Sequence, residues 1–137
     1  MTIPNKDSSQ QEIFDFVLNN LRKQGKQALD AKGNCVYRAD DGCKCAAGIL
    51  ILDSDYQPTF ENICIRALIR GETSSWDNKS SPQLLSWQNL DNEKTFLIEN
   101  LQTLHDNIDN WHNDGFVGEV AAKRIAKHQN LTYTAPE

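Results

Sequence analysis

The stretch from Gly33 to Asp53, GNCVYRADDGCKCAAGILILD, changes abruptly from turn-forming residues to a continuous apolar run. The run, residues 45–52, is too apolar for a surface loop, and its eight residues fall far short of the roughly 20 that span a membrane. It must therefore be buried in protein. Its alanines favour a helix and its Ile and Leu residues suit a strand. We predict a short buried helix that starts near Cys45.

Two turn signals precede this run. Residues 30–34 and 40–42 contain the Asp, Asn and Gly residues that tolerate tight turns. The β-branched and aromatic residues of 35–37 lie between the two turns. We therefore predict a hairpin here, with residues 27–29 pairing with residues 35–38 as a short ribbon.

An amphipathic helix is predicted near the start of the sequence. Ser9 and Glu12 have the spacing of a capping box, and Gly25 is placed to end the helix. Apolar residues recur between them at spacings of three and four, which gives the helix one buried face. These residues are Ile13, Phe14, Val17, Leu18 and Leu21.

Two shorter segments follow the apolar run. Residues 63–69 fit a short helix or a buried strand about equally, and we interpret them as a helix that ends at Gly71. Ser81 and Pro82 supply a cap and a proline at the first helical position, so a brief helix should follow. Its buried side would consist of Leu84, Leu85 and Trp87.

The longest predicted helix extends from Asp91 to Trp111. Its apolar face comprises Phe96, Leu97, Leu101, Leu104, Ile108 and Trp111. A last helix is predicted to be capped by Asp114. Its inward residues would be Phe116, Val117, Val120, Ala121, Ile125 and Ala126. A basic cluster near its end, Lys123, Arg124, Lys127 and His128, suits the helix dipole and is interpreted as a solvated face, with a contact to nucleic acid or an acidic partner as the alternative.

These segments predict an α+β, mainly α, fold: a single domain of about four to six helices with a small β-hairpin. The composition, 39% hydrophobic and 24% charged, is typical of a soluble globular protein. We assign residues 1–8 to a disordered N-terminus, 9–131 to the globular domain and 132–137 to a tail.

Charge and cysteine content narrow the classes of function. The net charge of −5 disfavours direct binding to nucleic acid, because such proteins usually present a basic patch. The sequence shows neither a secretory leader nor an apolar run of membrane-spanning length, so we expect a cytoplasmic protein without membrane contact. Four cysteines in 137 residues are too few for a disulfide scaffold, and we expect free thiols and no cofactor.

The central stretch resembles a motif of small uncharacterised proteins from phages and bacterial genomes. The residues that carry the resemblance are Gly33-Asn34-Cys35, Tyr37-Arg38, Gly42, Lys44-Cys45-Ala46-Ala47-Gly48 and Leu50-Ile51. Cys43 departs from the pattern. The resemblance implies an intracellular accessory protein, in the host cytoplasm if phage-encoded, and it implies no chemistry.

A thiol-dependent hydrolase or transferase is one candidate function. Cys45 would lie at a helix start, where backbone N–H groups stabilise a thiolate. His105 would act as the base, and Asp106 would orient the histidine. A buried, inert Cys45 thiol is the simpler interpretation, and we favour it.

A small zinc-binding interaction module is another candidate, because four cysteines suit tetrahedral zinc. The spacing disfavours it, since one residue separates Cys43 from Cys45 and structural zinc sites usually have two to four there. We therefore assign no metal ligand. A Cys35–Cys45 redox pair lacks the Cys-x-x-Cys spacing, and the common enzyme motifs are absent from the sequence.

We therefore favour binding of a host or phage protein over an enzymatic function. The candidate binding residues are Tyr37, Arg38, Trp76 and Asp106. Trp76 lies in a polar, aperiodic segment, where it would either pack on the core or anchor a partner. The predicted assembly is a monomer or a small homo-oligomer.

Overall fold

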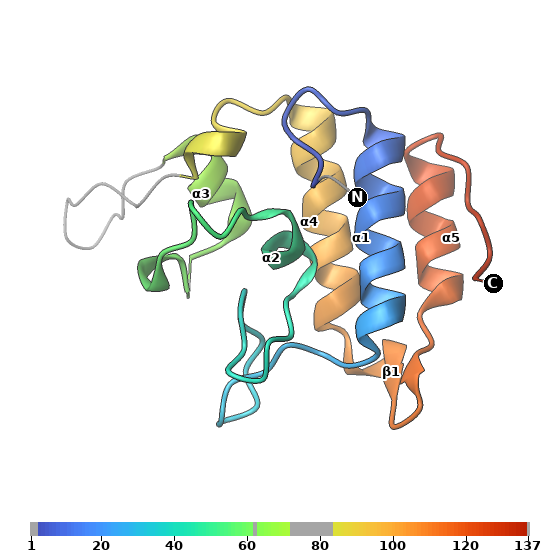
Figure 1. Ribbon diagram of the computed structural model, residues 1–137. Helices are drawn as coiled ribbons and strands as arrows, with labels where there is room; N and C mark the ends of the chain where they lie inside the picture. Colours follow the sequence, from blue (N-terminus) through green and yellow to red (C-terminus); the bar gives the residue numbers. More distant parts are fainter. Residues whose placement is uncertain (1–2, 62, 72–83, 137) are drawn as a thin grey trace.

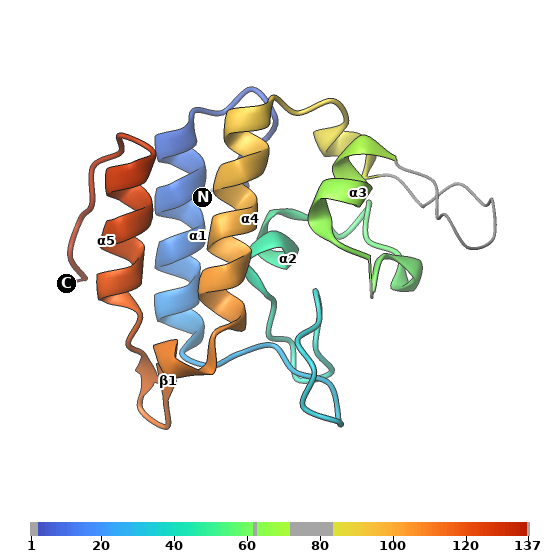
Figure 2. The same cartoon turned by 180° about the vertical axis from the view of Figure 1, so that it is seen from behind.

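The computed structural model describes residues 3–61, 63–71 and 84–136. Three longer helices, α1 (Gln10–Gln24), α4 (Asn92–Asp106) and α5 (Glu119–His128), run alongside one another (Figures 1 and 2). The α4 helix packs on both α1 and α5, and α2 (Ala46–Leu50) packs on α1 and α4. The short helix α3 (Ile65–Arg70) also packs on α4. The mainly helical single domain predicted from the sequence is confirmed.

The α1 helix forms as its sequence predicts. The Ser9 side chain accepts a hydrogen bond from the Glu12 backbone N–H, and the Glu12 carboxylate accepts one from Ser9, so both halves of the capping box are present. Gly25 ends the helix with φ of 75°, a left-handed conformation that glycine adopts without strain. All five predicted apolar residues are buried.

The apolar run forms α2, and Cys45 is its N-cap. All five residues of this helix are buried, as predicted. Gly48 lies so close to Tyr37 that an added Cβ would come within 2.1 Å of the Tyr37 carbonyl oxygen. Only glycine therefore allows α2 to pack this tightly on the preceding segment.

The ribbon predicted between residues 27–29 and 35–38 forms only in part, as a single antiparallel bridge. The two turns form, with φ of 85° at Gly33 and 91° at Gly42, and one isolated bridge joins the residues on either side of each turn. The two-stranded sheet lies elsewhere, between β1 (Trp111–His112) and β2 (Gly115–Phe116).

Side chains explain why no ladder forms around Tyr37. The Glu61 carboxylate accepts hydrogen bonds from the backbone N–H groups of Tyr37 and Arg38, at 2.9 and 3.3 Å. The Asp30 carboxylate binds the backbone N–H of Lys32 and Asn34 in the first turn. These donors are then occupied by carboxylates and do not pair with a strand.

The structure of the segment before α4 matches the prediction from the sequence in outline. The α3 helix ends at Gly71, as predicted, and the 3-10 helix η1 (Pro58–Phe60) precedes it. A second 3-10 helix, η2 (Leu85–Trp87), lies between the end of the undescribed residues 72–83 and α4. Trp87 is buried and donates its indole N–H to the Leu50 carbonyl at 3.1 Å. The predicted Ser81–Pro82 cap lies outside the described residues.

The α4 helix is shorter than predicted. It ends at Asp106, and η3 (Ile108–Asn110) and β1 follow, so Ile108 is 72% exposed rather than buried. The Asn107 side chain accepts from the Asp109 backbone N–H, and the Asn110 side chain donates to the Leu104 carbonyl. These local bonds replace the next helical turn. The predicted burial of Phe96 is also wrong, since this side chain is 51% exposed.

The last helix, α5, begins later than predicted. Gly118, not Asp114, is its N-cap, because β2 occupies the residues where the helix was expected to start. Ala122 and Ala126 face the core, whereas Val120 is 65% exposed. Val117 is exposed as well, so the predicted inward positions of Val117 and Val120 are wrong.

The C-terminal segment of the described chain contacts the bundle. Thr132 donates its backbone N–H to the Gln11 side chain of α1 at 2.8 Å, and the Tyr133 hydroxyl donates to Glu119 of α5. Arg22 also binds Glu119, at 2.7 Å, which ties α1 to α5. Within the described part of the chain, no helix combines the length and apolarity needed to cross a membrane.

Candidate functional site

A cleft of about 360 Å³ opens beside the C-terminal half of α4, and we call it the α4 cleft. Three segments form its walls: residues 35–37, the loop that leads into α3, and α4 itself. Its lining residues are Cys35, Val36, Tyr37, Glu61, Ile63, Cys64, Ile65, Glu99, Gln102, Thr103 and Asp106.

The structure brings together only some of the residues selected from the sequence. Tyr37 and Asp106 line the α4 cleft, whereas Arg38, Cys45 and His105 do not. Trp76 lies outside the described residues. Cys35 and Cys64, which the sequence interpretation did not select as site residues, are both exposed and line the cleft.

Cys45 lacks the surroundings of a nucleophile. Its side chain is fully buried, and its Sγ accepts a hydrogen bond from the Gly48 backbone N–H at 3.3 Å. Burial raises the pKa of the thiol to about 12, and the Gly48 N–H only partly offsets that effect. A nucleophilic cysteine needs the opposite shift and access to a substrate.

His105 is fully buried, and both of its ring nitrogens have partners. Nε2 accepts a hydrogen bond from the Ala28 backbone N–H at 3.0 Å, and Nδ1 lies 2.8 Å from Oδ1 of Asp106. Because Nε2 uses its lone pair to accept, the ring proton must be on Nδ1, which donates to Asp106. His105 therefore orients Asp106 and has no free nitrogen with which to accept a proton from a substrate.

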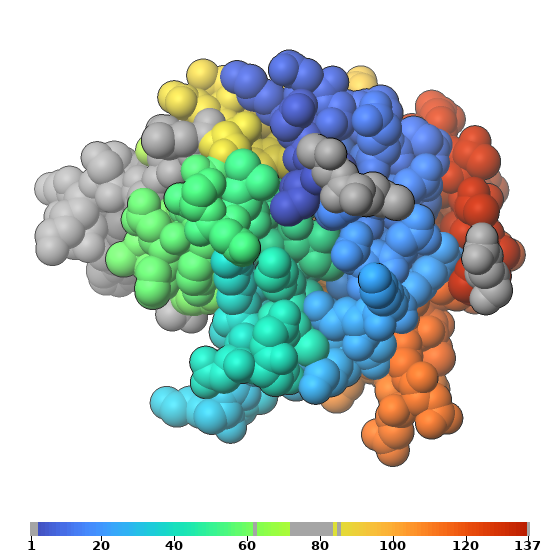
Figure 3. Space-filling model, in the orientation of Figure 1, coloured from blue at the N-terminus to red at the C-terminus, as the bar shows by residue number. Residues whose placement is uncertain are grey.

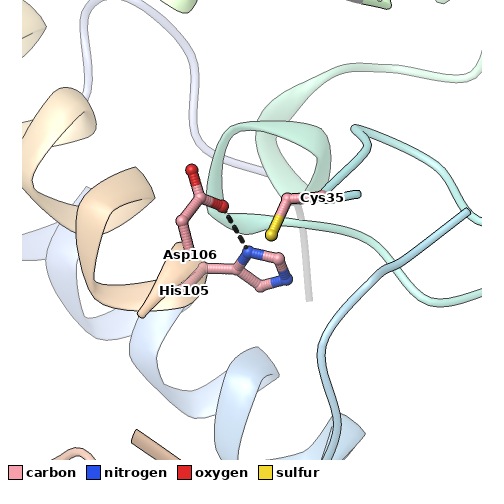
Figure 4. A group of neighbouring side chains, drawn as sticks. All are labelled: Cys35, His105 and Asp106. Carbon is pink, nitrogen blue, oxygen red and sulfur yellow. Dashed lines mark hydrogen bonds and ion pairs between the residues drawn. The ribbon is translucent and has the colours of Figure 1, made fainter. Parts of the chain in front are cut away.

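The thiol that lies near His105 is Cys35, not Cys45 (Figure 4). The Cys35 sulfur, a ring nitrogen of His105 and a carboxylate oxygen of Asp106 all lie within 4.8 Å of one another. Partial burial raises the pKa of Cys35 to about 11, and the negative charges of Asp106 and Asp30 add to the shift. The thiol is therefore protonated at neutral pH.

These three residues form the one group in the described ranges that is compact enough to hold a metal ion. A metal would need the lone pair of Nδ1, yet this nitrogen carries the ring proton while Nε2 accepts from Ala28. Metal-binding histidines instead donate their second nitrogen's proton to an acceptor. The hydrogen bonds therefore suit a proton-sharing network and argue against a metal ion. Cys43, Cys45 and Cys64 are not members of the group.

The α4 cleft has an acidic wall. Among the residues that the structure describes, its lining includes three carboxylates and neither lysine nor arginine. Glu61 is occupied by the backbone of residues 37–38 and by the Tyr56 hydroxyl, and Glu99 pairs with Arg66. Asp106 is the most open of these carboxylates to a ligand, because its side chain is 43% exposed.

Tyr37 and Arg38 stabilise the fold of the central stretch. The Tyr37 ring is buried, and its hydroxyl donates to the Ile63 carbonyl. Arg38 donates to the Ile51 carbonyl and pairs with Asp53, both at 2.8 Å, and its guanidinium lies 4.5 Å from the Tyr56 ring centroid. These contacts join the turns to the residues that follow α2.

No protein-family model matches the chain, and neither a curated protein nor a solved structure does. The geometry of the site therefore carries the functional argument.

Proposed function

We propose that the protein acts by binding another protein, a host or phage protein in the cytoplasm, and that the α4 cleft accepts a cationic side chain of this partner. The orientation of Asp106 carries the proposal. Its carboxylate accepts hydrogen bonds from buried His105 and from Gln102 while remaining partly exposed in an acidic cleft. A carboxylate has about four lone-pair positions, so it retains capacity for a ligand.

Because Asp106 is already held in one orientation, its side chain would lose less conformational entropy when a partner binds. A carboxylate fixed by neighbouring hydrogen bonds is ready for a bidentate contact with a guanidinium, which is the strongest pairing of this kind. Gln102 is itself fixed, because its Oε1 accepts from the Ala47 backbone N–H at 2.9 Å. The chain of bonds from Ala47 through Gln102 to Asp106 supports an arginine-binding site.

The thiol-dependent enzyme is the weaker alternative. It would require a thiolate at Cys45 and a free histidine nitrogen, whereas burial raises the pKa of Cys45 to about 12 and His105 binds Ala28 and Asp106. Cys35 is closer to the histidine, but its pKa is raised to about 11. Each of these observations favours binding over catalysis.

The substitution Thr103→Arg tests the proposal. Residue 103 lies four residues after Glu99 and three before Asp106, so an arginine there would pair with both carboxylates and occupy the cleft. Thr59→Arg is the matched control, because Thr59 is exposed and does not line the cleft. Both variants should fold.

The readout is affinity capture from host lysate, quantified by mass spectrometry. We expect a protein that wild type and Thr59→Arg capture equally, that Thr103→Arg loses, and that a short arginine-containing peptide displaces. Equal capture by all three would show that the α4 cleft is not the contact.

A further inference from the structure

Exposed apolar side chains gather at the end of the molecule that carries the β1–β2 hairpin. Within the described ranges, six large hydrophobic residues are exposed, and three of them, Ile108, Val117 and Val120, border this hairpin in sequence. A fourth, Leu29, lines a groove of about 500 Å³ together with Ile108. The clustering points to a docking surface, since scattered exposed hydrophobics need no such explanation.

The groove lies between residues 26–29 and the hairpin, which projects beyond its neighbours (Figure 3). Lys26, the one lysine among the described lining residues, is paired with Asp41 at 3.1 Å. Asp109 and Asp114 beside the groove are exposed, and neither forms an ion pair with a described residue. We call this surface, Leu29, Ile108, Asp109 and Asp114, the acidic end.

The outer face of α5 also combines an exposed aliphatic side chain with exposed charges, but here the charges are positive. Val120, Lys123, Arg124 and Lys127 recur at spacings of three and four opposite the buried Ala122 and Ala126, and we call them the basic stripe. All four are exposed. Arg124 and Lys127 make no ion pair with any residue of the described ranges.

We propose that the acidic end of one copy of this chain binds the basic stripe of a second copy. Each surface joins exposed aliphatic side chains to charges that form no ion pair within the described ranges, and the charges are opposite, so each surface is complementary to the other. The α5 helix starts directly after the hairpin, so the two surfaces adjoin within one molecule. In a dimer with twofold symmetry, the acidic end of each copy contacts the basic stripe of the other copy. Both surfaces of both copies are then covered, so the assembly closes as a dimer.

The size and polarity of these surfaces set the strength of the dimer. A few aliphatic side chains bury less area than a stable interface needs, so the dimer should be weak. Exposed charges contribute, so raising the ionic strength should dissociate it. We expect sedimentation equilibrium to detect dimer at about 0.5 mM protein in about 20 mM salt and mostly monomer in about 500 mM salt.

Charge reversal gives the decisive test. Arg124→Glu with Lys127→Glu places like charges in both contacts, and so does Asp109→Lys with Asp114→Lys, so each double variant should be monomeric. Mixing the two variants restores opposite charges in both contacts of a mixed dimer. Association should therefore return in the mixture, at about the wild-type level.

Single reversals at the opposite end of the fold, Lys6→Glu and Asp7→Lys, are the controls and should leave association unchanged. Thr103→Arg should also still dimerise, which separates this proposal from the cleft proposal. A wild-type chain that is monomeric in low salt, or reversal variants that do not associate when mixed, would overturn the dimer.

Discussion

The Nδ1 atom of His105 donates its proton to the carboxylate of Asp106, 2.8 Å away, while Nε2 accepts from the Ala28 backbone N–H. The buried ring thus joins the end of α4 to the segment that follows α1. It also holds the most exposed cleft carboxylate in one orientation. The histidine is therefore a positioning residue rather than a base.

Replacing His105 should destabilise the fold. His105→Ala removes a fully buried ring and leaves the Ala28 N–H without an acceptor, so the free energy of unfolding should fall by about 2–4 kcal/mol. Urea unfolding followed by circular dichroism would measure the change. His112→Ala, at an exposed position, should change it by less than about 0.5 kcal/mol. Equal effects of the two substitutions would remove His105 from its proposed role.

Gly48→Ala should destabilise the protein even though alanine is the better helix former. Propensity alone would stabilise the helix by about 1 kcal/mol. The added Cβ would instead come within 2.1 Å of the Tyr37 carbonyl oxygen, so the backbone must move. This movement should lower the free energy of unfolding by about 1–3 kcal/mol or more. A raised melting temperature would contradict the close packing of α2 on Tyr37.

Leu101→Ala should remove about 2–5 kcal/mol from the free energy of unfolding, because this side chain is fully buried in the core. Phe96→Ala on the same helix is the control. Phe96 is 51% exposed, so its truncation should lower the free energy of unfolding by less than the Leu101 truncation does. The reverse order would mean that α4 presents a different face to the core.

The contact between Glu119 and Arg22 should make the free energy of unfolding depend on pH. Burial alone would raise the pKa of the Glu119 carboxyl, but hydrogen bonds from Arg22 and Tyr133 outweigh it and hold this pKa below its usual value. The stabilisation is therefore present above the pKa of an unfolded glutamate, about 4.3, and is lost as the pH falls through the lower folded value.

The difference in unfolding free energy between wild type and Glu119→Gln should thus shrink as the pH falls below about 4. Urea titrations at a series of pH values would measure it. A difference that is constant from pH 7 to pH 2.5 would exclude the ionised contact as its source.

Local sequence signals were enough to predict several elements. The capping box at Ser9 and the left-handed glycine at Gly25 mark the two ends of α1, and the apolar run after Cys45 predicts α2. These features depend only on residues within a few positions of one another. The mainly helical fold class follows from them.

The remaining features depend on contacts between distant residues. Glu61 occupies the backbone donors at Tyr37 and Arg38, which prevents the ladder expected there. The side chains of Asn107 and Asn110 end α4 earlier than its apolar spacing predicts. Such competition between side chains and backbone is not visible in periodicity.

The candidate site shows the same limit. His105 and Asp106 do share a hydrogen bond, but the thiol beside them is Cys35 and not Cys45. The turn at residues 30–34 predicts that Cys35 returns toward Leu29, and the bridge between these residues is present. Only the tertiary contact of Ala28 with His105 then places Cys35 at the end of α4.

The rate of thiol alkylation in the folded protein is the most direct test of the binding function against thiol catalysis. Mass spectrometry would measure this rate for each cysteine separately. The pKa of Cys35 is about 11, so its rate at pH 7.5 should be low and should rise about tenfold per pH unit up to pH 10. Asp106→Asn should accelerate it, because the mutation removes a negative charge that raises this pKa. Cys45, with a pKa of about 12 and no exposure, should resist labelling.

Exposed Cys64 serves as the internal reference for reagent access in every sample. We expect slow, pH-dependent labelling of Cys35 and none of Cys45 until the protein unfolds. Rapid labelling of either thiol at neutral pH, lost in a folded His105→Ala variant, would instead show a histidine-activated nucleophile and contradict the binding function.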